Sequence, residues 1–289
     1  EGMKSILFRS LLAVLFMVLF SFMTLYFRYI RDSTLIHELP KLNPPSSKYS
    51  SDEPWLELFD GVSLKGWKVK IKGEPLGQDL RETFRVQDKS ISVNYENYSV
   101  WDDSFGHLFY HLSFSHYILK LEYRFLGEQL AGARGLEWAW RNSGVMIHAQ
   151  APGNMSIEQK FPVSIEVQLL GAKEDEHRTT GNLCTPGTHV MLESRLITQH
   201  CVNSLSSSVS GDQWVVLELE VRGNDIIRHY VNGQLVLQYS SPVLDTWSLD
   251  ARNIFHHNDS KIELSDGYIA LQSESHPVQF KNIKLLPLL

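Results

Sequence analysis

The chain has 289 residues, of which 43% are hydrophobic and 21% are charged, a balance typical of a globular protein with a sizeable core. Its 33 acidic residues outnumber its 27 basic ones, and no run of lysine or arginine is present. Binding to a nucleic-acid backbone requires clustered cations, so we exclude nucleic acid as a partner. The length fits one β-sandwich or barrel better than two domains.

The first 31 residues predict a hydrophobic anchor or signal. Leu11–Phe27 contains seventeen residues without a charge, which is at the short end of what spans a bilayer. Lys4 and Arg9 precede this run, but the bulky residues 21–26 do not resemble the small-residue cleavage site of a secretory signal. We therefore expect an uncleaved transmembrane helix. A cleaved signal and a buried core helix are the alternatives.

Residues 32–54 are rich in proline and serine, a composition that stays extended and solvated. They predict a tether between the anchor and a domain over residues 55–289. We expect this domain to lie outside the membrane, in the periplasm or the extracellular space, whether the chain is anchored or secreted.

From residue 55 onward the hydrophobic pattern has a period of two, which is the signature of β-strands. Apolar and polar residues alternate over 116–125, 163–169 and 215–222, so each segment is expected to bury one face. Asn232-Gly233 predicts a hairpin turn between strands at 226–231 and 234–239, and a second turn is expected at Gly223-Asn224. The pattern predicts an all-β fold of two packed antiparallel sheets.

Cys184 and Cys201 are the two cysteines of the chain. In an exported protein such a pair indicates a disulfide, whereas in a cytosolic protein it indicates two buried thiols. Because we expect export, we predict the Cys184–Cys201 bond.

A first candidate binding segment begins at Trp138. We expect Trp138 and Trp140 to share one side of an extended segment, with Arg141 and Asn142 beside them. Flat aromatic faces next to forked polar groups suit a sugar, whose C–H faces stack and whose hydroxyls need directional partners. The alternative is that both tryptophans fill the core.

A second candidate lies on the polar face of the 163–169 strand. Glu166 and Gln168 alternate with apolar residues there, and Glu166 is the carboxylate that we expect to act in catalysis. His148 and Glu274 are its predicted catalytic neighbours, and His276 is a predicted substrate contact. The alternative is that these polar side chains face water.

Motifs of other enzyme classes are absent from the sequence, including HExxH, GxSxG, the phosphate loop and the dinucleotide fingerprint. The residues 256–259, His-His-Asn-Asp, could contact a metal, but a loop of this composition is more often simply solvated.

Several segments resemble the 3-keto-disaccharide hydrolase domain family, a group of bacterial exported proteins with a concanavalin A-like jelly-roll fold. The resemblance covers roughly residues 55–286. The residues that carry it are LFDGVSLKGW at 58–67, NSG at 142–144, EVQ at 166–168, and GYIALQSE at 267–274 with VQFKNI at 278–283.

The resemblance implies cleavage of a glycosidic bond in a sugar oxidised to a ketone at carbon 3. Such a ketone acidifies the C2 hydrogen, so one general base can start elimination of the C1 substituent, and water can add afterwards. Glu166 or His148 would be the base, and Arg141 or Asn142 would stabilise the enolate oxygen. The sequence specifies no cofactor, and a bound divalent cation is an alternative to these side chains.

Two other classes of function remain open. The same sandwich could be a non-catalytic, lectin-like module that holds a carbohydrate at the cell envelope. It could also be a structural envelope protein whose groove is empty. Turnover of a 3-keto-sugar would distinguish an enzyme that cleaves 3-keto-glycosides from both of these classes.

Overall fold

The computed structural model describes residues 54–132, 137–257 and 260–288. The predicted anchor and nearly all of the tether lie outside these residues. Among the residues described, no helix is both long enough and apolar enough to cross a membrane.

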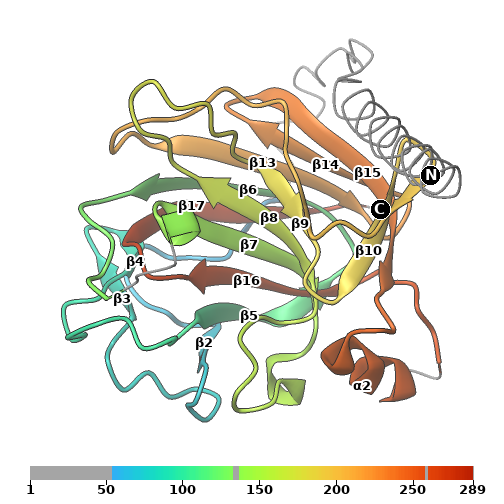
Figure 1. Ribbon diagram of the computed structural model, residues 1–289, viewed down its shortest axis with the longest axis horizontal. Helices are drawn as coiled ribbons and strands as arrows, with labels where there is room; N and C mark the ends of the chain where they lie inside the picture. Colours follow the sequence, from blue (N-terminus) through green and yellow to red (C-terminus); the bar gives the residue numbers. More distant parts are fainter. Residues whose placement is uncertain (1–53, 133–136, 258–259, 289) are drawn as a thin grey trace, which may run out of the picture. The chain divides into compact units, whose positions relative to one another are not determined.

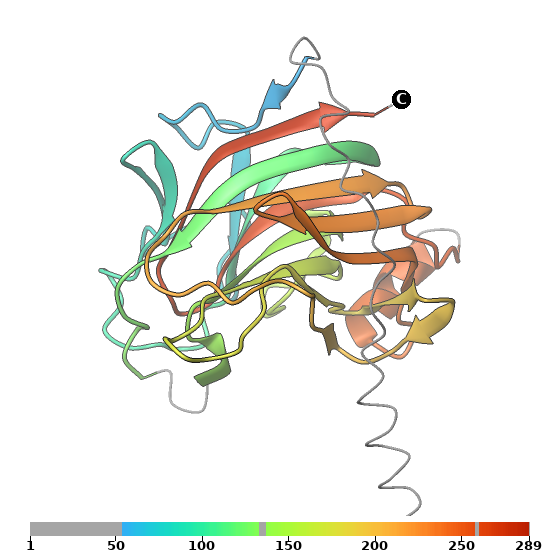
Figure 2. The same cartoon turned by 90° about the horizontal axis from the view of Figure 1, so that it is seen from above.

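Within the described residues, the strands form one ten-stranded and one seven-stranded sheet, which lie face to face (Figures 1 and 2). The larger sheet runs, in order, β11 (Arg195–Ile197), β10 (Thr188–Leu192), β15 (Gln234–Leu244), β14 (Ile226–Val231), β13 (Val215–Arg222), β6 (His116–Phe125), β17 (Val278–Pro287), β4 (Ser90–Val93) and β3 (Phe84–Gln87), with β1 (Leu56–Glu57) paired to β17.

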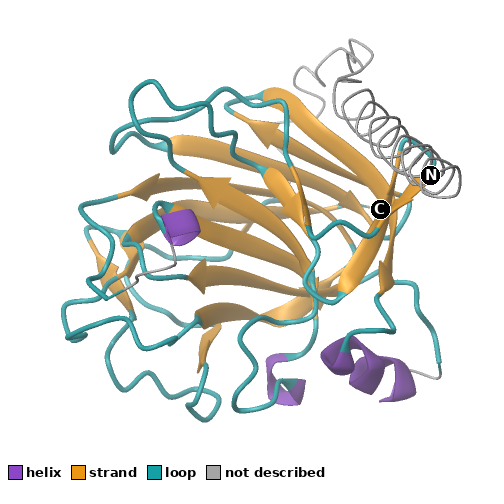
Figure 3. Ribbon diagram, in the orientation of Figure 1, coloured by secondary structure: helices purple, strands orange, loops and turns teal. Residues whose placement is uncertain are grey.

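The smaller sheet runs, in order, β12 (Cys201–Val202), β9 (Asn182–Cys184), β8 (Ile165–Leu170), β7 (Asn142–Ala149), β16 (Gly267–Ser273), β5 (Gly106–Phe114) and β2 (Trp67–Ile71). Over the residues that the structure describes, helical structure is confined to connections: η1 (Glu137–Ala139), η2 (Pro152–Asn154) and α2 (Leu249–His257), as Figure 3 shows. Every paired strand in both sheets is antiparallel to its neighbours, which confirms the predicted all-β two-sheet sandwich.

The core lies between the sheets, because each strand turns its alternate apolar residues inward. Leu119, Leu121 and Tyr123 of β6 are each about 1% exposed and pack in one cluster with Val167 of β8 and Leu271 of β16. Burying a large apolar side chain stabilises the fold by roughly 1.5–3 kcal/mol. The period-two pattern therefore predicted both the strands and the faces that they bury.

Both predicted turns are confirmed. Asn232 and Gly233 connect β14 to β15 with φ values of 48° and 80°, as the hairpin geometry requires. Gly223 lies between β13 and β14, which pair as far as Arg222 and Ile226.

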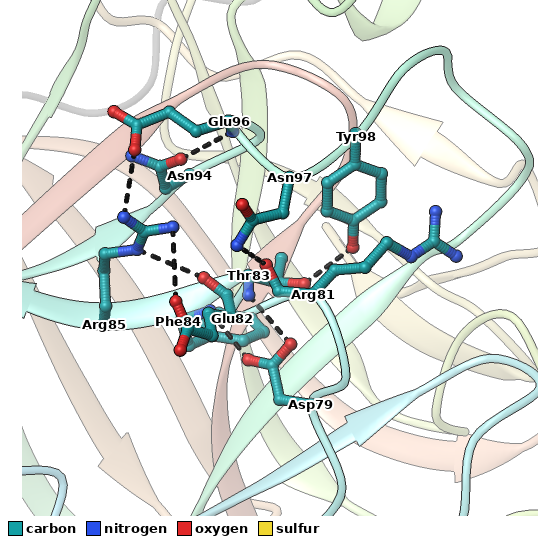
Figure 4. Close-up of polar contacts among 10 residues, drawn as sticks. All are labelled: Asp79, Arg81, Glu82, Thr83, Phe84, Arg85, Asn94, Glu96, Asn97 and Tyr98. Atoms are coloured by element: carbon teal, nitrogen blue, oxygen red, sulfur yellow. Dashed lines mark hydrogen bonds and ion pairs between the residues drawn. The ribbon is translucent and has the colours of Figure 1, made fainter.

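Polar contacts fix the connections at the outer edge of the larger sheet (Figure 4). The Asp79 carboxylate accepts hydrogen bonds from the backbone amides of Thr83, at 2.8 Å, and Phe84, at 2.9 Å. The Thr83 hydroxyl lies 2.6 Å from the Tyr98 hydroxyl, and the Arg81 guanidinium lies over the Tyr98 ring at 4.2 Å. These contacts tie the segment before β3 to the segment after β4.

The disulfide between Cys184 and Cys201 is present, and it joins β9 to β12 at a point where the two residues are direct ladder partners. It closes a loop with a sequence separation of 17 residues. In the chain-entropy description, a crosslink over a loop of this size lowers the entropy of the unfolded state.

We expect the Cys184→Ala/Cys201→Ala double variant to lose about 3 kcal/mol of unfolding free energy, because the unfolded chain regains the freedom of that loop. Urea denaturation followed by tryptophan fluorescence measures this change. Wild-type protein unfolded in the presence of a reductant is the control and should lose a similar amount. Unchanged stability of the double variant would show that the bond contributes nothing.

Candidate functional site

The outward face of the seven-stranded sheet carries a row of polar residues at one level of the ladder. Strand pairing places them in register, since their sequence neighbours Leu183, Val167, Val145, Leu271 and Leu108 all point into the core. The positions of this polar row, in order across the sheet, are Asn182, Gln168, Gly144, Gln272, His107 and Lys70. The sheet therefore brings together residues that are far apart in the sequence.

Gly144 lets the Glu166 side chain lie across β7. A β-carbon at position 144 would stand 2.7 Å from Glu166 Oε1 and 2.9 Å from its Cγ, which is too close for any side chain. The Glu166 side chain on the neighbouring strand can therefore lie where it does only because residue 144 is a glycine. The Ser143 hydroxyl donates a hydrogen bond to the backbone oxygen of Gln272 at 2.9 Å, which ties β7 to β16.

Glu166 and Glu274 form an interacting pair of buried carboxyl groups, with 6% and 2% of their surfaces exposed. Burial raises the pKa of Glu166 to about 8. Burial and the neighbouring Glu166 charge raise the pKa of Glu274 well above its usual value. At neutral pH the pair is therefore largely protonated, so it can donate protons as well as accept them.

Several polar atoms beside this pair are buried without a partner among the described residues. They are both amide atoms of Gln272, both ring nitrogens of His107 and Oδ1 of Asn142. Burying such groups unpaired costs free energy, so their presence indicates a place where ligand hydroxyls or ordered water bind.

His107 and Gln272 are direct partners in the β5–β16 ladder. Burial and the nearby Lys70 charge lower the pKa of His107 to about 3, so its ring is neutral and offers one donor and one acceptor. Lys70 itself is engaged, since its Nζ donates to the backbone oxygens of Ile71, Glu74 and Ile157.

His107 and Gln272 were not among the predicted site residues. Gln272 was part of the family-like GYIALQSE segment, and His107 alternates with the core residue Leu108. That alternation was the available signal for an outward-facing histidine.

The expectation that Trp138 and Trp140 share one side of an extended segment is wrong. Residues 137–139 form the 3₁₀ turn η1, and the strand begins only at Asn142. Backbone oxygens of this turn accept hydrogen bonds from Arg178, whose guanidinium reaches Trp138 O at 2.8 Å and Trp140 O at 2.6 Å. The Trp138 side chain is 49% exposed.

Trp140 lies among cations, with Arg141, Lys173 and Arg178 within 5.3–5.9 Å of its ring. Arg141 is not directed at the carboxyl pair, because its guanidinium forms a 2.6 Å ion pair with Asp212. The arginine expected to stabilise an enolate therefore has a structural partner.

The remaining predicted substrate contacts are Gln168, Asn142 and His276, and they lie near Glu166 and Glu274 or on the segments next to them. The Gln168 Oε1 accepts a hydrogen bond from Asn182 at 3.2 Å, and the Asn142 amide lies 3.4 Å from Trp138 O. His276 packs edge-on between Phe125 and Trp140, and burial lowers its pKa to about 3. The structure thus groups Glu166, Glu274, Asn142, Gln168 and His276 at one end of β7 and β16.

His148 is not a neighbour of Glu166 in this arrangement. It lies at the other end of β7 in a backbone conformation with φ of 47°, and its Nε2 donates to Gly223 O at 2.9 Å. Its ionisable neighbours are Asp266 and His116.

The segment 256–259, which could contact a metal but was expected to be solvated, is described only in part, since residues 258 and 259 lie outside the described residues. His256 and His257 belong to the last turn of α2, where His257 Nδ1 lies 2.6 Å from Asn253 O. Over the part of the chain that the structure describes, no three His, Cys, Asp or Glu side chains are grouped as metal ligands.

Comparison with known proteins gives one family match, to the 3-keto-alpha-glucoside-1,2-lyase-like domain over residues 54–286. No curated protein matches the chain significantly. Among solved structures, a proposed glycosyl hydrolase of Parabacteroides distasonis ATCC 8503 is similar, with 16% identity, a TM-score of 0.47, and coverage of 81% of this chain and 94% of that one.

Two further similar structures have different functions. A Bacillus subtilis carbohydrate-binding module has 11% identity and a TM-score of 0.44, with coverage of 76% of this chain and 95% of that one. A Bacillus licheniformis β-glucanase has 9% identity and a TM-score of 0.43, with coverage of 83% of this chain and 100% of that one.

The raised carboxyl pKa values have a consequence for stability. Between pH 4.5 and about 8 the folded protein keeps the Glu166 proton that the unfolded chain releases, so the free energy of unfolding falls as the pH rises. We expect Glu166→Gln to remove part of this fall and to stabilise the protein at pH 8 relative to wild type by on the order of 2 kcal/mol.

Urea denaturation of both proteins at several pH values between 5 and about 9 tests this expectation. Glu193→Gln, a change at an exposed carboxylate in the turn after β10, is the matched control and should follow wild type. If Glu166→Gln also followed wild type, Glu166 would not be a buried carboxyl with a raised pKa.

Proposed function

The chain belongs to the family of the 3-keto-alpha-glucoside-1,2-lyase-like domain, and from this premise we propose that it cleaves the glycosidic bond of 3-keto-glycosides. The observation that carries the proposal is the buried pair of Glu166 and Glu274 beside polar atoms that have no partner among the described residues. Membership of this family also supports the more general conclusion that the domain acts on carbohydrates.

In the proposed reaction, the ionised Glu166 removes the proton at C2, which the C3 ketone makes acidic. The electron pair forms an enolate, and its collapse breaks the bond between C1 and the leaving oxygen. The neutral Glu274 carboxyl protonates that oxygen, and water then adds across the C1–C2 double bond. A pKa of about 8 makes Glu166 a stronger base than an ordinary carboxylate, while a fraction remains ionised at neutral pH.

The enolate oxygen needs a donor that is already in place. The Gln272 amide is buried and has no partner in the described part of the chain, and it lies on the strand that leads to Glu274. The neutral His107 ring beside it can supply a second donor. Donors fixed in a dry site stabilise developing charge without reorganisation, so these two residues take the role that Arg141, paired with Asp212, does not offer.

The proposal includes export. A disulfide persists in oxidising compartments, and the Cys184–Cys201 bond therefore supports a domain outside the cytosol. Leu11–Phe27, outside the described residues, would hold it at the membrane.

We expect the full chain in mild detergent to release free sugar or aglycone from a 3-keto-glucoside, and we expect Glu166→Gln to lower kcat by at least about 100-fold, since it removes the general base. Reducing-sugar release measured at saturating substrate checks this. Glu193→Gln is the matched control and should retain full turnover. Undiminished turnover by Glu166→Gln would contradict the assigned base, and binding of the 3-keto-glucoside by wild type without any release would favour a lectin-like module.

The pH dependence gives a second test. Because the base must be ionised and its pKa is about 8, kcat/KM should rise about tenfold per pH unit below pH 7 and level off above about pH 8. Initial rates at low substrate concentration between pH 5.5 and about 9.5 measure this profile. A profile that is flat over this range would mean that no carboxyl with a raised pKa acts as the base.

A further inference from the structure

A cleft lies at the opposite end of the seven-stranded sheet from the carboxyl pair. It has a volume of about 650 Å³ and is bounded by α2, the segment 148–156 and the segment 263–268. Figure 1 shows α2 beyond the end of the sheet at which β16 begins. The residues of the cleft that matter here are His148, Asp250, Asn253, Glu263, Asp266 and Tyr268.

This cleft is separate from the carboxyl pair. Neither Glu166 nor Glu274 lines it. An apolar cluster on the outward face of the sheet, made by Phe109, Met146, Ala149, Met155 and Ala270, lies between the polar row and the start of β16. Gly267, which lines the cleft, is five residues from Gln272, which corresponds to about 16 Å along a strand.

The cleft is rich in hydrogen-bond acceptors and carries negative charge. Asp250, Glu263 and Asp266 form no ion pair with any residue that the structure describes, and the described lining contains no lysine or arginine. The buried His148 supplies a further hydrogen-bond acceptor to the cleft. Its Nε2 donates to the Gly223 carbonyl, so in the neutral ring Nδ1 is an acceptor, and this buried Nδ1 has no partner among the residues that the structure describes.

The three carboxylates do not converge on one point, since no group of three His, Cys, Asp or Glu side chains among the described residues could hold a metal ion. Their charge is spread along the cleft. This arrangement suits a ligand that offers several donors at separate positions, one of them cationic, rather than a single ion.

The rest of the lining suits a sugar ring. Tyr268, Ile254 and Leu264 provide apolar surface, and Asn253 and Ser265 provide amide and hydroxyl groups next to it. A pyranose has C–H faces that pack on such surface and hydroxyls that need directional partners.

We propose that this cleft binds a sugar that carries a free, protonated amino group. The ammonium group is held by the carboxylates of Glu263 and Asp266, and the hydroxyls are held by His148 Nδ1 and Asn253. The site is an auxiliary binding site, and it does not depend on the reaction proposed for the carboxyl pair.

Isothermal titration of the full chain in mild detergent at about pH 6, where the amine is protonated, tests the proposal. The probes are the disaccharide of glucosamine, its N-acetylated counterpart, and putrescine, which has amines but no sugar ring. The glucosamine disaccharide should bind at least about tenfold more tightly than either of the others, because it alone offers both the charge and the ring.

Variants locate the site. Asp266→Asn and Glu263→Gln should each weaken binding of the glucosamine disaccharide by about tenfold, as expected for the loss of a charge-assisted hydrogen bond. Glu57→Gln, at an exposed carboxylate of β1, is the matched control, and Glu166→Gln should also leave binding unchanged.

Four results would overturn the proposal. Equal binding of the N-acetylated disaccharide would show that charge is not recognised, and equal binding of putrescine would show that the ring is not. No binding of the glucosamine disaccharide, or binding that Asp266→Asn and Glu263→Gln leave intact, would show that the cleft is not the site. None of these measurements uses turnover of a 3-keto-glycoside, so they separate this proposal from the proposed reaction.

Discussion

The strict alternation of side chains along each β-strand is the constraint on which the rest of this domain depends. In β16, Leu271 fills the core while its neighbour Gln272 points to the outward face. In β8, Val167 is buried between the sheets while Glu166 and Gln168 point outward. The residues that stabilise the sandwich and the residues that form the candidate site are therefore positioned by the same strands, and a shift of register by one residue would exchange them.

The local pattern made the strands predictable. The alternation at 117–125 and 215–221 determines both the secondary structure and the buried face. Asn232-Gly233 determines its turn, because asparagine and glycine adopt positive φ values more easily than most residues. Glu166 and Glu274 were also predicted, because Glu166 lies on the predicted polar face of the 163–169 strand and Glu274 lies in a family-like segment.

The long-range order was not predictable in the same way. Nothing in the local sequence specifies that β16 pairs with both β5 and β7, and this pairing is what places His107 beside Gln272. The segment around Trp138 and Trp140 reads as extended by alternation, yet Arg178, distant in sequence, binds its backbone oxygens in a helical turn. His148 was misplaced because its left-handed backbone turns it toward Gly223, away from the carboxyl pair.

The disulfide has a consequence beyond the closing of a loop. A sheet edge exposes unpaired backbone groups to which other chains can add a strand. On one side, the seven-stranded sheet ends in the two-residue strand β12, which Cys201 ties covalently to Cys184. Cys184 is in turn the ladder partner of Glu166. The opposite edge, β2, carries Lys68, whose charge disfavours strand addition. The bond therefore holds β12 over β9 and covers the edge of the sheet on the side of β8, the strand that bears Glu166.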